Sequence, residues 1–90
     1  MHKHSHQDIQ QVLNRISRAA GHLSAIGRMV EEGRDCPDVL IQLAAVRSAI
    51  NSIGKVIIQD HMTHCVTEAI EAGDRTALDR FNAALESFLK

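Results

Sequence analysis

The chain has 90 residues, enough for one small domain with a modest core of its own. Hydrophobic residues make up 44% of it, but Phe81 and Phe88 are its two aromatic side chains, and it has one proline. This composition favours packed helices over a β-sandwich. The formal net charge of −1 gives no overall signal of nucleic-acid binding. The distribution is uneven, however, because residues 1–30 carry a balance of +3 and residues 60–90 a balance of −3.

A first amphipathic helix is predicted from about Gln7 to Glu32. Its apolar residues recur at spacings of three and four, which places them on one face. Arg15 and Arg18 are three residues apart and therefore share a different face. Gly33 supplies a stop. The apolar face consists of Ile9, Val12, Leu13, Ile16, Ala19, Ala20, Leu23, Ile26 and Val30.

A second, much longer helix is predicted from Pro37 to about Glu71. Proline favours the first helical position, which makes Cys36 the expected N-cap, and Gly73 ends the helix. At 1.5 Å per residue it would be roughly 50 Å long. Its apolar series consists of Val39, Leu40, Leu43, Ala44, Ile50, Ile53, Val56, Ile57, Met62, Val66 and Ile70.

A short third helix completes an all-α chain of three helices, capped by Asp74 or Thr76. Three helices of such unequal length cannot close a compact core alone, so the apolar faces require a partner chain. We expect a His-rich flexible tip over residues 1–6 and a single helical domain over residues 7–90. The apolar face of the third helix consists of Leu78, Phe81, Leu85, Phe88 and Leu89.

The expected location is the cytoplasm. No apolar run approaches the roughly 20 residues of a membrane span, and the N-terminus has no apolar signal-peptide core. In a reducing compartment, the two cysteines are more plausible as thiolate ligands or sensors than as a disulfide.

The candidate metal ligands are Cys36, His61 and Cys65. His61 and Cys65 lie four residues apart on one predicted helix face, where imidazole and thiolate make half a site for a soft or borderline metal. A buried cysteine beside a surface histidine would explain this pair equally simply. Cys36 lies 25 residues before His61, roughly 37 Å along a straight helix, so one chain cannot bring the two to one ion.

A second chain resolves this difficulty. An antiparallel copy of the long helix, crossing near Ala49 and Ile50, would place Cys36 of one chain beside His61 and Cys65 of the other. Twofold symmetry then gives two equivalent sites, and the same pairing buries the long apolar face.

Four motifs carry a resemblance that extends over nearly the whole chain: Arg15-Ile16 with Gly21-His22-Leu23, Asp35-Cys36, Gln42 to Arg47, and Asp60 to Cys65. With the Cys–x24–His–x3–Cys spacing, they resemble the CsoR/RcnR family of metal-sensing and formaldehyde-sensing repressors. The resemblance implies an antiparallel four-helix-bundle dimer that assembles into a flat tetramer. It also implies a protein that binds operator DNA when metal-free and releases it on binding its inducer, with Arg15, Arg18 and Arg47 at the family's DNA-contacting positions.

Within this resemblance the inducer is expected to be copper(I), which Cys36, His61 and Cys65 would hold as three ligands. Copper sensors often carry a tyrosine before the first cysteine and a glutamate in the last helix, where this chain has Asp35 and Phe81. The alternative is nickel(II) or cobalt(II), because nickel sensors use a histidine near the N-terminus and His4 has the matching position. Two imidazoles and two thiolates would suit planar nickel(II).

Two other classes of function compete with a repressor. A metal chaperone or storage protein would bind the same ion without binding DNA, and Arg15, Arg18 and Arg47 are the residues that distinguish the two. An enzyme is not expected, because Cys65 and His61 lack an evident third orienting group and an oxyanion-binding loop.

Overall fold

The computed structural model describes residues 6–90, apart from the side chains of His6, Gln7, Asp60 and His61. This part of the chain is entirely helical and contains no β-strand. Two compact units divide the described residues, and they are called here the unit of residues 5–53 and the unit of residues 54–90. The predicted His-rich tip over residues 1–6 lies outside the described residues, except that α1 already begins at His6.

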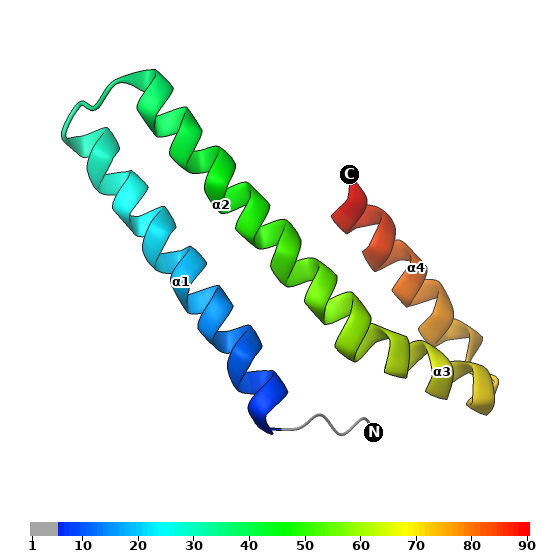
Figure 1. Ribbon diagram of the computed structural model, residues 1–90. Helices are drawn as coiled ribbons and strands as arrows, with labels where there is room; N and C mark the ends of the chain where they lie inside the picture. Colours follow the sequence, from blue (N-terminus) through cyan, green and yellow to red (C-terminus); the bar gives the residue numbers. More distant parts are fainter. Residues whose placement is uncertain (1–5) are drawn as a thin grey trace. The chain divides into compact units, whose positions relative to one another are not determined.

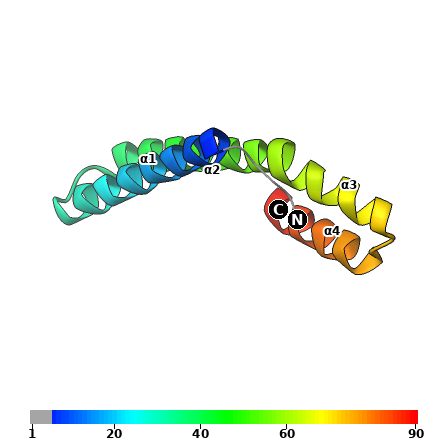
Figure 2. The same ribbon diagram turned by 90° about the horizontal axis from the view of Figure 1, so that it is seen from below.

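In the unit of residues 5–53, α1 (His6–Glu31) and the first part of α2 (Cys36–Ile57) run side by side in opposite directions (Figures 1 and 2). The short connection depends on Gly33, whose φ of 73° suits a residue without a Cβ. Ile26 and Val46 are its buried hydrophobic residues, each 3% exposed. These observations confirm the prediction of a first helix that ends before Gly33.

The structure begins α2 one residue earlier than the sequence analysis expected. The carbonyl of Asp35 accepts the first helical hydrogen bond from the Val39 N–H (3.1 Å). Cys36 is therefore the first residue of the helix rather than its N-cap, and Asp35 has the cap position. The prediction of Cys36 as the N-cap was wrong, because Pro37 is tolerated throughout the first helical turn.

The predicted second helix is divided in the structure, which is why the chain has four α-helices instead of three. A π-helical turn, η1 (Ile58–Met62), separates α2 from α3 (Thr63–Ala72), although the backbone stays helical throughout. The wider turn accommodates one extra residue, so it shifts the apolar face that follows it. Ala69 is buried at 7% exposure, whereas Ile70, which the periodicity placed on that face, is 62% exposed.

In the unit of residues 54–90, α3 and α4 (Arg75–Leu89) form a tight hairpin (Figures 1 and 2). Gly73 ends α3 with a φ of 68°, and Oδ1 of Asp74 accepts a hydrogen bond from the Ala77 N–H (3.0 Å). Of the two predicted caps for this helix, Asp74 is the one that the structure uses. Gly54 also lies in this unit, and a Cβ built on it would overlap the ring of Phe88.

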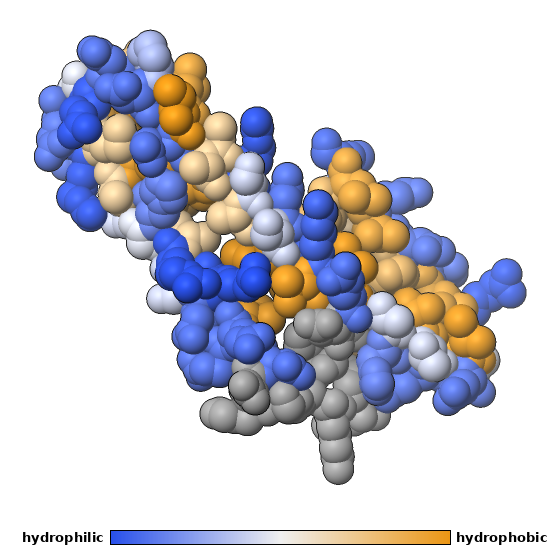
Figure 3. Space-filling model, in the orientation of Figure 1, coloured by the Kyte–Doolittle hydropathy of each residue, from blue (hydrophilic) through white to orange (hydrophobic). Residues whose placement is uncertain are grey.

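Apolar surface remains open on both units. Figure 3 shows it near the first turns of α2 and along α4. In the part of the chain that the structure describes, the buried hydrophobic residues are Ile26, Val46 and Ala69. Large hydrophobic residues that are exposed outnumber them: Ile9, Leu13, Ile16, Leu23, Val30, Leu40, Ile41, Leu43, Ile50, Ile70, Phe88 and Leu89. Exposed apolar surface on this scale is typical of a chain that buries it against another.

The structure joins the apolar residues of α2 into one helix of 22 residues. By length and composition alone, this helix is long and apolar enough to cross a membrane. The same composition is found in helices that pair with other helices, so this observation is weak evidence for a membrane span.

The contact between Gly54 and Phe88 leads to a stability prediction. Gly54→Ala should stabilise a Phe88→Ala background by about 1 kcal/mol, because alanine has the higher helix propensity. In the parent chain the ring must move to admit the new methyl group, so the stabilisation should vanish or reverse. Denaturant unfolding of all four chains at one protein concentration gives this double-mutant cycle. Equal effects of Gly54→Ala in both backgrounds would contradict the predicted contact.

Candidate metal centre and DNA-binding face

The two cysteines have different surroundings. Cys36 is the first residue of α2 and is exposed, whereas Cys65 lies in α3 and is partly buried, and within the described residues neither forms a disulfide. Cys36 belongs to the unit of residues 5–53 and Cys65 to the unit of residues 54–90. Each cysteine carries a thiol whose ionised form, the thiolate, binds metals. The partly open position of each side chain leaves its sulfur accessible to an ion.

The π-helical turn η1 (Ile58–Met62) contains His61. The backbone N–H of Thr63 donates to the carbonyl of Ile58, and the Thr63 hydroxyl donates to the same oxygen (3.0 Å). The hydroxyl of Thr67 repeats this pattern one turn later, donating to the carbonyl of Thr63 (3.0 Å). Two threonines thus support the backbone between His61 and Cys65. π-Helical turns are frequent at functional sites, and this one was not foreseen from the sequence.

The donor chemistry of Cys36, His61 and Cys65 suits copper(I), nickel(II) or zinc(II), since soft thiolates and imidazole bind these ions. Among the side chains that the structure describes, no three His, Cys, Asp or Glu residues are grouped closely enough to hold a metal ion. The side chain of His61 and all of His4 lie outside that description. His64 is exposed and Phe81 is half-buried.

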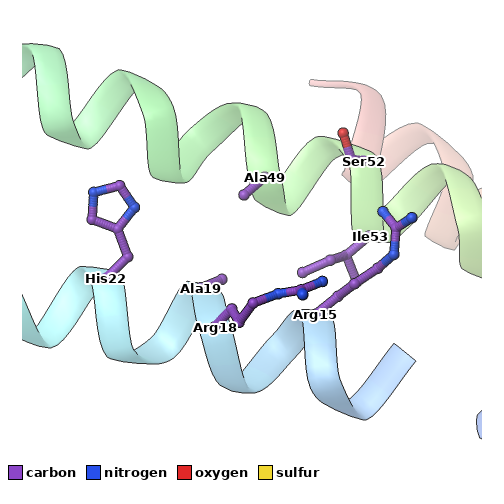
Figure 4. A pocket seen from close by; sticks show the side chains of 7 residues that line it. All are labelled: Arg15, Arg18, Ala19, His22, Ala49, Ser52 and Ile53. Atoms are coloured by element: carbon purple, nitrogen blue, oxygen red, sulfur yellow. The ribbon is translucent and has the colours of Figure 1, made fainter. Parts of the chain in front are cut away.

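Arg15 and Arg18 lie together beside a hollow in the unit of residues 5–53 (Figure 4). They share one face of α1, and their guanidinium groups extend into the space between α1 and α2. The hollow has a volume of about 280 Å³. Its lining also includes Ala19 and His22 of α1 and Ala49, Ser52 and Ile53 of α2. Arg47, the third predicted DNA-binding residue, is exposed on α2 and does not line the hollow.

A hydrogen bond joins α1 to α2 at one end of this hollow. Nε2–H of His22 donates to Oε1 of Gln42 (2.7 Å), and the pair is partly buried. Sequence reasoning identified His22 and Gln42 only as parts of motifs and did not single out Ser52. The spacing of four between Arg18 and His22 could have indicated a shared face, but the contribution of α2 could not be read from it.

Comparison with known proteins identifies the family. Residues 8–87 match the family described as metal-sensitive transcriptional repressor. The chain belongs to this family. The copper-sensing transcriptional repressor CsoR of Bacillus subtilis (strain 168) is 40% identical over 73 residues, covering 81% of this chain and 71% of that protein.

Two solved structures extend the comparison. The copper-sensing repressor CsoR with Cu(I) from Geobacillus thermodenitrificans NG80-2 matches with a TM-score of 0.88 and 28% identity, covering 100% of this chain and 95% of that one. The nickel-responsive transcriptional regulator InrS matches with a TM-score of 0.72 and 42% identity, covering 97% and 99%. The chain is therefore a metal-sensing transcriptional repressor with an all-helical fold, and its family is not one of enzymes.

Proposed function

We propose that this repressor binds operator DNA when metal-free and releases it when copper(I) binds to Cys36, His61 and Cys65. Each site is shared between two chains, Cys36 coming from one and His61 with Cys65 from the other. The observation that carries the proposal is the helical state of every residue from Cys36 to Cys65. No loop is available within one chain to fold Cys36 back onto the other two ligands.

The open apolar surface supports the same arrangement. Leu40, Leu43 and Ile50 of α2 are exposed, although each belongs to the apolar series of the long helix. An antiparallel copy of that helix would cover these side chains and bring the shared ligands together. Each fully buried side chain of this size contributes about 1.5–3 kcal/mol, so the dimer has a substantial driving force. Two such dimers would form a flat tetramer, and the cytoplasm is the compartment in which it would meet its operator.

The basic face supports DNA contact through Arg15 and Arg18, with Arg47 as a third cation. The structure groups the first two on one side of α1 with no carboxylate in the lining of the hollow beside them. Cations that contact DNA phosphates supply a salt-dependent, sequence-independent part of the affinity. A metal chaperone or storage protein would not need this arrangement.

Nickel(II) is the second candidate inducer, and a specific observation favours it. InrS, a nickel-responsive regulator, is 42% identical to this chain over nearly its whole length. Planar nickel(II) takes four donors, and His4 would supply the one that Cys36, His61 and Cys65 lack. The choice between copper(I) and nickel(II) therefore depends on His4.

The DNA-binding assignment predicts the effect of Arg15→Ala/Arg18→Ala. Operator affinity should fall, and the slope of log K against log salt should become shallower by about 0.9 for each DNA phosphate that the variant no longer neutralises. Metal affinity should be unchanged, since neither residue is a proposed ligand. Fluorescence anisotropy on a duplex that the protein selects from a random-sequence pool measures both quantities.

A matched control for this experiment is Arg34→Ala/Arg80→Ala, which removes the same charge from exposed positions outside the hollow. Its salt slope should stay close to that of the parent chain. If both double variants have the same slope, overall charge determines the affinity and the assignment of Arg15 and Arg18 fails.

His4→Ala separates the two inducers. Under the copper proposal, copper(I) affinity and metal-triggered DNA release should remain close to the parent values, because three soft ligands suffice. For a nickel sensor, the same change should remove the thiolate-to-nickel charge-transfer band and prevent DNA release. Absorption spectra and DNA-release titrations with each metal provide the measurement. His2→Ala is the matched control, and loss of release in His4→Ala alone would refute copper(I) as the inducer.

A further inference from the structure

The hollow between α1 and α2 has the charge of a site for an anion. Its volume of about 280 Å³ leaves ample room for a tetrahedral oxyanion. Arg15 and Arg18 extend into it, and no acidic side chain is part of its lining (Figure 4). Two guanidinium groups provide fixed arrays of N–H donors, which match the oxygens of phosphate.

The polar groups of this hollow are available for a ligand. Within the described part of the chain, neither guanidinium nor the Ser52 hydroxyl has a hydrogen-bond or ion-pair partner. Ser52 lines the hollow from α2, but its hydroxyl points away from the two guanidinium groups (Figure 4), so the donors in the hollow are the arginines of α1. The His22–Gln42 hydrogen bond links the same two helices at one end of the hollow.

A second hollow, in the unit of residues 54–90, provides a contrast. It has a volume of about 360 Å³ and contains Arg75, but Asp79 and Asn82 are also in its lining. The acidic group offsets the single arginine there. The hollow beside Arg15 and Arg18 is therefore the one whose charge favours an anion.

We propose that this hollow binds a single tetrahedral oxyanion of the inorganic-phosphate class, held by Arg15 and Arg18. Free phosphate and a phosphate of the DNA backbone share this chemistry, so the two compete for the same arginines. The competition rests on the proposed function, whereas the binding of free phosphate does not. The cellular concentration of phosphate would then affect how tightly the repressor holds DNA.

NMR of the full, metal-free chain tests the site directly. Sodium phosphate is exchanged for sodium chloride at constant ionic strength and pH, and the arginine Nε–H signals are followed. The signals of Arg15 and Arg18 should shift in a saturable way, while those of Arg34 and Arg80 should not. Shifts that fail to saturate, or that are equal for all four arginines, would overturn the proposal.

Measuring DNA affinity in the presence of phosphate separates this inference from the proposed function. Phosphate should raise the apparent Kd for the selected duplex more than chloride does at the same ionic strength. Saturable phosphate binding with unchanged DNA affinity would support the anion site and refute the use of Arg15 and Arg18 on DNA. DNA binding that requires both arginines, with no saturable phosphate binding, would refute the anion site and leave the DNA contact intact.

Discussion

The unbroken helical backbone from Cys36 to Ala72 is the constraint on which the rest of this protein depends. A helix satisfies its own backbone groups but cannot bury its apolar face alone. In this chain Ile26, Val46 and Ala69 are buried, while Leu40, Leu43 and Ile50 remain exposed. The same helix carries proposed ligands before and after the π-helical turn. One additional chain would cover the apolar face and complete the ligand set, so the same pairing of helices would serve both assembly and metal binding.

This coupling gives a physical account of how a small helical protein can respond to an ion. Metal ligands on two chains, as proposed, would link the free energy of metal binding to the geometry of the dimer. The arginines that we propose contact DNA, Arg15 and Arg18, lie on α1, and the His22–Gln42 hydrogen bond connects α1 to α2. A change in the pairing of α2 would therefore also move Arg15 and Arg18. The π-helical turn, with Thr63 supporting its hydrogen bond to Ile58, is a second place where the helix can adjust.

Much of this fold could be predicted from the sequence, because its helices carry clear local signals. Gly33 and Gly73 are needed for positive φ, and Asp74 caps α4 as expected. The π-helical turn could not be predicted, since the apolar residues near it fit either helical register. Ile70 was therefore assigned to the buried face that Ala69 occupies. The proposed ligands were found by their chemistry and spacing, but the hollow required two helices to be placed side by side, which no local pattern specifies.

The central claim is that each metal site contains residues of two chains, and a mixed dimer tests it most directly. Cys36→Ala chains and His61→Ala/Cys65→Ala chains are refolded together with different affinity tags, and the heterodimer is isolated. The account predicts one intact copper(I) site of parent affinity in this heterodimer, measured by competition with a chromophoric chelator. Each variant alone should lack such a site. A heterodimer that binds copper(I) no more tightly than either variant would contradict the shared site.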